Sequence, residues 1–152
     1  AAIGETMSHV RTQLRENVAV LLNGINTGFP VTVFQNRAYT LDESVLPCIN
    51  VQTGNETIET LTVDFPAHQV RTEQLILTII VESVNAVDDL VDQICWAIEL
   101  VLAGNVAMAK NFYLAGTSAI EPSAIGEKPI ISVDMRYIAE IHTLENNPEA
   151  YL

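Results

Sequence analysis

The sequence predicts an α+β fold: a mostly antiparallel β-sheet with two main helices packed on one face, in a single domain. Segments 8–25 and 86–103 space their apolar residues three and four apart, as one buried face of a helix requires. Segments 70–83 and 128–142 alternate in the two-residue period of a strand. Connections are short, so neighbouring strands should run antiparallel, and 152 residues suffice for one core.

The first predicted helix, 8–25, begins at Ser8, whose hydroxyl can accept a bond from a free backbone N–H. Gly24 and Gly28 mark its end. Its apolar stripe faces the core and consists of Val10, Leu14, Val18, Leu21, Leu22 and Ile25.

Residues 31–55 read as two short strands joined by a polar turn, the first ending at Phe34 and the second running from Pro47 to Val51. Residues 54–68 then form a long polar excursion, which within a compact domain is usually functional or disordered. Apolar residues alternate with polar ones along it, and this alternation predicts a projecting, strand-like arm: Ile58, Leu61, Val63 and Phe65.

The strand at 70–83 is so rich in Ile and Val that a central strand covered on both faces is expected. The second helix, 86–103, follows Asn85 as its expected cap, and its acidic first turn suits the helix dipole. Trp96, the only tryptophan, falls on the acidic side of this helix. Two readings of Trp96 stay open: a contact residue for a partner, or cover over the helix edge.

The last third of the chain predicts a strand with a break at 113–127 and an uninterrupted strand at 128–142. The expected order is therefore helix, three strands, helix, two strands, within a domain spanning 8–143. Residues 1–7 are expected to be a flexible extension, and 144–152 a flexible acidic tail.

Charge excludes one class of function. The sequence has seven basic and 19 acidic residues, a net charge of −12. It therefore lacks the cations that would neutralise the phosphates of duplex DNA. The excess serves solubility, or it forms a surface past which DNA slides without adhering. No apolar run is long enough to span a membrane.

Catalytic and metal-binding motifs are absent from the sequence. There is no phosphate-binding glycine loop, no HExxH and no GxSxG. Cys48 and Cys95 lie in apolar patterns and indicate free thiols in a reducing compartment, and the three histidines are isolated. The chain is therefore predicted not to be an enzyme, with no catalytic, cofactor or metal residues. Asp64 and Glu73 could form a carboxylate pair only if the fold brings them together.

The order of elements resembles the tail terminator family of long-tailed bacteriophages, the minor tail protein U-like proteins. In that family a strand ending in Phe leads into an Asn-Arg turn, an Asp-Glu follows, and a Pro opens an alternating strand. The matching residues here are Phe34, Asn36, Arg37, Asp42, Glu43, Pro47, Ile49 and Val51. The resemblance covers 8–143; the N-terminal extension and the acidic tail depart from it.

The resemblance implies a structural virion protein that is made in the bacterial cytoplasm. Its hexameric ring would cap the head-proximal end of the tail tube and meet the head–tail connector protein, while DNA passes an acidic lumen without specific binding. We expect arginines of one protomer to face carboxylates of the next. The expected interface residues are Arg11, Arg15, Arg37, Asp42, Glu43, Glu56, Glu59, Asp64, Arg71, Asp88, Asp92 and Trp96.

Two alternatives stay open at this point. Another neck, connector or tail tube ring would share the acidic lumen and the small α/β body, but a tube subunit would stack into long polymers. A small ligand-binding domain or an enzyme without a visible motif is the other possibility, against which the missing motifs count.

Overall fold

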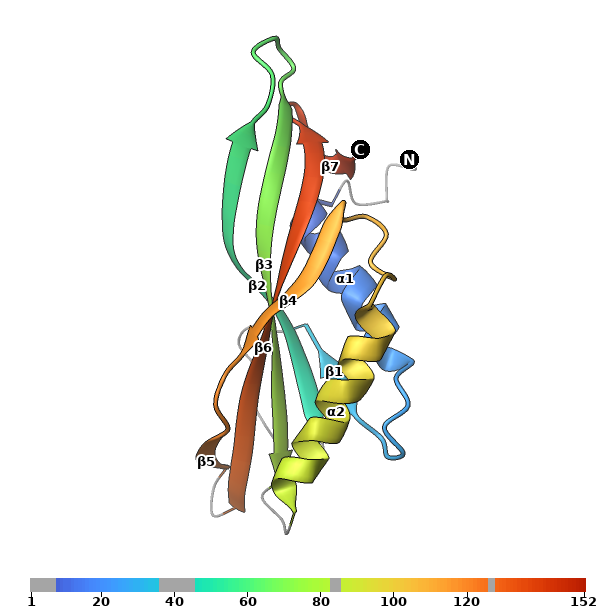
Figure 1. The fold of residues 1–152 in the computed structure, drawn as a ribbon, viewed down its shortest axis with the longest axis vertical. Helices are drawn as coiled ribbons and strands as arrows, with labels where there is room; N and C mark the ends of the chain where they lie inside the picture. The colour runs from blue at the N-terminus through green and yellow to red at the C-terminus, as the bar shows by residue number, and fades with distance from the viewer. Residues whose placement is uncertain (1–7, 36–45, 83–85, 126–127) are drawn as a thin grey trace.

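A computed structural model describes residues 8–35, 46–82, 86–125 and 128–152, and within these ranges it contains two helices and seven strands (Figure 1). In chain order the elements are α1 (Val10–Asn23), β1 (Thr32–Phe34), β2 (Cys48–Thr60), β3 (His68–Glu82), α2 (Val87–Leu102), β4 (Asn111–Thr117), β5 (Glu121–Ile125), β6 (Lys128–Leu144) and β7 (Asn147–Tyr151). The α+β class and the two-helix arrangement predicted from the sequence are confirmed.

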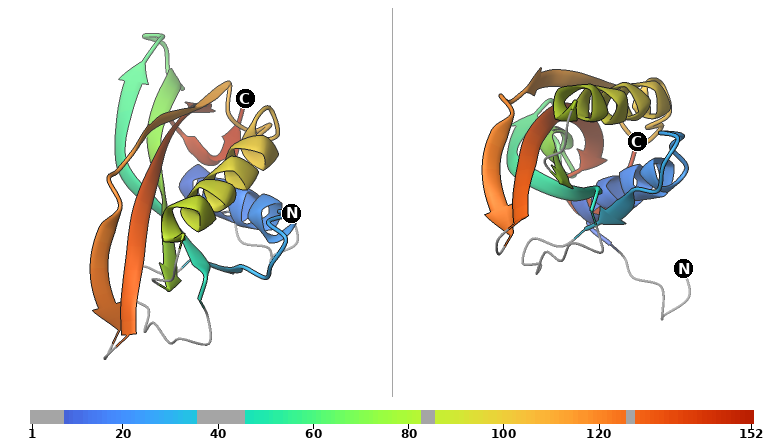
Figure 2. Two further views of the ribbon diagram at one scale, coloured as in Figure 1. Left: turned by 60° about the horizontal axis from the view of Figure 1, so that its bottom comes forward. Right: turned by 90° about the horizontal axis from the view of Figure 1, so that it is seen from below.

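All strands belong to one sheet with the order β1-β2-β3-β6-β4, and β5 and β7 also pair with β6. Every pairing is antiparallel except the short parallel pair of β1 with β2. The long strands β3 and β6 form the centre, in register from His68↔Leu144 to Glu82↔Ile130. The sheet is strongly twisted and curved along its length (Figures 1 and 2).

Both helices pack on one face of this sheet (Figure 2). The inward residues of β3 and β6 meet the apolar stripes of α1 and α2 in the main core, which includes Leu14, Leu75, Ile94, Ile98 and Met135. The outward residues of the same strands are mostly half-exposed, so the expectation that 70–83 is covered on both faces is wrong for most of its length. A second, small core of Cys48, Ile80 and Ile130 covers only one end of β3.

The helices begin and end slightly inside their predicted limits. α1 is capped by His9, whose side chain accepts a bond from the Arg11 backbone N–H, rather than by the expected Ser8. Gly24 closes it as predicted. α2 follows Ala86, which has a left-handed backbone with φ of 61°; the expected cap, Asn85, lies outside the described residues.

The strand-like character predicted for the polar excursion is confirmed for its first half, whereas the tail expected to be flexible contains a strand. The first half of the polar excursion, up to Thr60, continues β2, and its residues pair with β3 from Glu56↔Glu73 to Thr60↔Gln69 after a register shift. The expected flexible tail contains β7, which pairs with β6 at Thr143↔Tyr151 and Leu144↔Asn147. Backbone pairing to a long central strand stabilises both segments although their side chains are polar.

Candidate assembly surfaces

The most prominent surface feature is the hairpin arm, residues 56–73, in which β2 and β3 extend past the ends of the helices (Figure 1). Its turn exposes large apolar side chains: Val63 is 100% exposed and Phe65 75%. Ile58 and Leu61 are about half exposed. A projecting apolar tip costs solvation free energy in an isolated chain, and such exposed patches mark contact sites.

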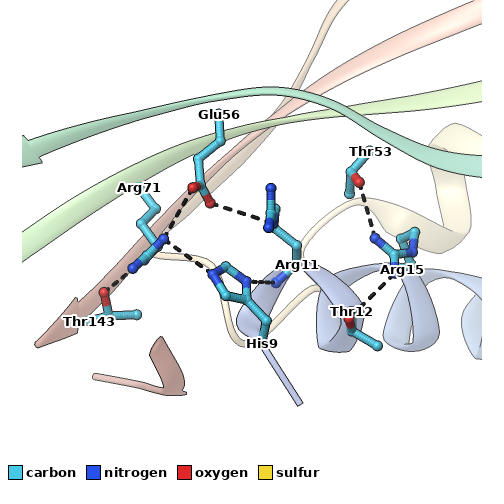
Figure 3. A network of polar contacts seen from close by, with 8 residues as sticks. All are labelled: His9, Arg11, Thr12, Arg15, Thr53, Glu56, Arg71 and Thr143. Atoms are coloured by element: carbon cyan, nitrogen blue, oxygen red, sulfur yellow. Dashed lines mark hydrogen bonds and ion pairs between the residues drawn. The ribbon is translucent and has the colours of Figure 1, made fainter. Parts of the chain in front are cut away.

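The buried side chain of Arg71 connects the base of the arm to β6 and to the start of α1 (Figure 3). Arg71 on β3 is only 6% exposed, and its Nη1 donates to Glu56 Oε1 on β2 at 3.1 Å. Its Nε donates to Thr143 Oγ1 on β6 at 3.0 Å, and Nη1 lies 3.4 Å from His9 Nε2 at the start of α1. The Arg71 guanidinium therefore joins β3 to β2, to β6 and to the start of α1. The several donors of a planar guanidinium allow one side chain to make these contacts together.

Two more arginines of α1 lie against this network. Arg11 Nε is 4.0 Å from Glu56 Oε2, and Arg15 Nη1 donates to Thr53 Oγ1 at 3.1 Å (Figure 3). Burial and the nearby Arg11 and Arg71 charges lower the pKa of His9 below its ordinary value. A neutral His9 suits its role as a hydrogen-bond acceptor at the helix start.

Glu73 is a buried acid without a partner. It follows Arg71 by two residues on the inward face of β3, is fully buried, and neither carboxylate oxygen has a hydrogen-bond partner among the described residues. Asp64 lies at the exposed arm tip, so the two carboxylates do not form a pair. An unpartnered buried acid costs free energy, and it marks a weak point in the core below the arm.

The sheet has an unpaired edge on each side. β1 pairs only with Cys48–Asn50 of β2, so within the described residues no strand covers the outer edge of β2 from Gly54 to Thr60. On the opposite side β4 pairs only with β6, and its other edge is likewise free among the residues described. Unpaired edges are templates for pairing with another chain.

The solvent-facing side of α2 combines acids with apolar residues. Asp88, Asp92 and Glu99 are exposed there, and Trp96 is 60% exposed beside Leu100. A shallow hollow of about 270 Å³ lies between Trp96 and Ile25, which follows the end of α1. Trp96 is thus on the surface, where both readings of it from the sequence remain possible.

The helix-free face of the sheet mixes polar, charged and aliphatic side chains, among them Ile76 on β3 and Ile138 on β6. Its side chains on β6 include Asp134, Arg136 and Glu140, and Thr78 on β3 donates to Asp134 at 2.8 Å. This face has no helix over it (Figure 2).

The structure separates the residues expected at an interface into three groups. Arg37, Asp42 and Glu43 lie outside the described residues. Arg71 and Glu56 form an ion pair inside one protomer, so neither is available to a neighbouring protomer. Arg11 and Arg15 lie beside this ion pair, Arg11 near Glu56 and Arg15 bonded to Thr53. The expected interface residues that are exposed and lie outside this network, on the arm and on α2, are Glu59, Asp64, Asp88, Asp92 and Trp96.

The sequence did not predict the pairing of two histidines or the burial of Glu73. His68 and His142, 74 residues apart, meet at 2.8 Å. Glu73 could have been found, since the alternation of Leu75, Leu77 and Ile79 extends to it on the inward face.

The thiols show no sign of activation. Cys48 and Cys95 are free, and burial raises the pKa of each to about 11; Asp92 and Glu99 add to the effect at Cys95. Among the described residues there is no cluster of three or more His, Cys, Asp or Glu side chains placed to bind a metal ion. None of the described helices has the length and apolar character to cross a membrane.

No protein family model matches this chain, and no curated protein matches it. Among solved structures it is similar to a chain of a structure described as "Virion of native gene transfer agent (GTA) particle", with a TM-score of 0.38 and 14% identity. The match covers 94% of this chain and 98% of that chain.

Proposed function

We propose that this chain is a structural virion protein that forms a closed ring, and specifically a phage tail terminator. The observation that carries the proposal is a pair of strand edges with no partner strand among the described residues, residues 54–60 of β2 and the outer edge of β4, on opposite sides of one sheet. The free edge of β4 in one protomer can pair with the free edge of β2 in the next. Such a contact is head-to-tail, and it closes into a ring if the rotation per subunit is right.

The resemblance to tail terminators supplies the finer details of this proposal: a hexameric ring at the head-proximal end of the tail tube, which ends polymerisation and meets the connector. The helix-free face would line the lumen. Its acids, Asp134 and Glu140, would repel the phosphates of passing DNA, while the helices form the outer wall.

The arm is the proposed contact with the tail tube or the neighbouring protomer. Val63 is fully exposed and Phe65 is 75% exposed in the protomer, so their apolar side chains are available to a partner. Replacing both with Ser should leave the free energy of unfolding within about 0.5 kcal/mol of the wild-type value. The same change should weaken assembly, measured as ring mass by light scattering or as binding to tail tubes.

Val20→Ser is the matched control, since Val20 is 72% exposed on α1, away from the arm. It should alter neither stability nor assembly. If the arm variant assembles and binds tubes as the wild type does, the arm has no role in assembly.

Arg37 is the remaining cation proposed for the interface between protomers. Arg37→Glu is expected to weaken ring formation and leave the protomer folded, as judged by circular dichroism. Normal assembly of this variant would remove Arg37 from the interface.

A second candidate within the same class is a tail tube or connector ring. Sheet edges that pair head-to-tail also suit a tube subunit, which would stack into long polymers rather than stop at one ring.

A further inference from the structure

We infer that His68 and His142 form a two-histidine binding site for a divalent transition-metal ion at the root of the arm. The inference does not depend on ring formation, because both ligands belong to one protomer.

The two rings are already placed as a chelating pair. His68 opens β3 and His142 lies near the end of β6, diagonally across the antiparallel pair that joins Val70 to His142. His68 Nε2 is 2.8 Å from His142 Nδ1, and the ring centroids are 5.0 Å apart. Neighbouring antiparallel strands hold two imidazoles at a fixed spacing, so binding a shared ion requires little ordering of the backbone.

The surrounding backbone keeps this spacing. The His68 N–H donates to Thr62 Oγ1, and the His68 carbonyl accepts from Leu61. The His142 carbonyl accepts from Leu152 at 2.8 Å. Both side chains are half-buried, so an ion can reach them from solvent.

The separation favours one class of ion. Metal–imidazole bonds are about 2.0–2.1 Å, so two nitrogens at right angles around a metal lie about 2.9 Å apart, and two at the tetrahedral angle about 3.3 Å. The observed 2.8 Å fits the right angle better. Square-planar and octahedral ions such as Cu²⁺ and Ni²⁺ should therefore be preferred to Zn²⁺.

Binding requires no net loss of protons from the pair. In the present contact one ring nitrogen carries a hydrogen and the other accepts it. If that hydrogen moves to the remote nitrogen of the same ring, both rings stay neutral, and His68 Nε2 and His142 Nδ1 each offer a lone pair. Since no third protein ligand joins them in the described residues, water completes the coordination.

The test is a titration of tag-free protein with Ni²⁺ by isothermal calorimetry, followed by Cu²⁺. One Ni²⁺ per chain is expected, with Cu²⁺ bound more tightly. His68→Gln and His142→Gln should each weaken binding by at least about tenfold. At a free ion concentration a hundred times Kd, the Tm of the wild type should rise by roughly 5–10 °C.

His9→Gln is the matched control, because His9 is the only other histidine and lies at α1. It should bind Ni²⁺ as the wild type does. Electron paramagnetic resonance of the Cu²⁺-loaded wild type, which needs no variant, should show coupling to two imidazole nitrogens. No stoichiometric binding, unchanged affinity in the two Gln variants, or coupling to a single nitrogen would each overturn the site.

Discussion

Removal of the Arg71 side chain tests the account of the arm root most sharply. Arg71→Met keeps most of the volume but leaves Glu56, whose side chain is only 14% exposed, facing Arg11 at 4.0 Å as its nearest cation. It also removes the bond to Thr143. Breaking a buried ion pair by deleting one partner typically costs about 3–5 kcal/mol, because the other charge stays buried.

The expected result is a loss of that size in the free energy of unfolding, measured by urea denaturation and far-ultraviolet circular dichroism. For a chain of this length it lowers Tm by roughly 6–20 °C. The double variant Glu56→Met, Arg71→Met removes both charges, so it should return to within about 1 kcal/mol of the wild type.

Arg136→Met is the control, because Arg136 is exposed on the helix-free face and its loss should cost less than about 0.5 kcal/mol. The reasoning is refuted if Arg71→Met costs under 1 kcal/mol, or if the double variant is no more stable than the single one.

Three further predictions follow from the described contacts. Glu73→Met should raise the free energy of unfolding by about 1–3 kcal/mol, since it removes an unpartnered buried carboxylate; a less stable variant would show that Glu73 has a partner. Cys48 and Cys95 should react with a disulfide reagent at pH 7.5 about a hundredfold more slowly than an ordinary thiol, because a pKa near 11 rather than 9.0 lowers the thiolate fraction by that factor; equal rates would contradict the burial. His9 has a lowered pKa in the folded state, so the unfolded chain binds its proton first and stability falls as pH drops below about 6.5. His9→Asn keeps a capping acceptor and should flatten that fall in pH-dependent melting curves, whereas an unchanged profile would exclude His9 as its source.

The sequence predicted the helices and the central strands because periodicity reports which face of an element is buried. Leu14 and Val18 in one helix, and Leu75 and Leu77 in one strand, lie in the core as their spacing required. The alternation at Ile58 and Leu61 predicted a strand-like arm, but not that the arm continues β2, because Gly54 and the Thr- and Glu-rich residues after it have the composition of a loop. They are a strand because β3 pairs with them. β7 was missed for the same reason, since its pairing with β6 is made by the backbone.

Of the residues expected at an interface, the sequence correctly placed only those on exposed surfaces. Glu59, Asp64, Asp92 and Trp96 lie on the surface as a polar pattern suggests. Arg71 was expected at an interface because it is a cation among few, yet its partners Glu56 and Thr143 are 15 and 72 residues away. Spacing along the chain carries no signal for such long-range pairs.

Negative-stain electron microscopy of the purified wild type, with light scattering for mass, tests the central claim most directly. The account predicts discrete closed rings of one size, formed by the protein alone or on the ends of added tail tubes. Long tubes would indicate a tube subunit instead. A monomer at every concentration that also fails to bind tube ends would contradict the terminator function.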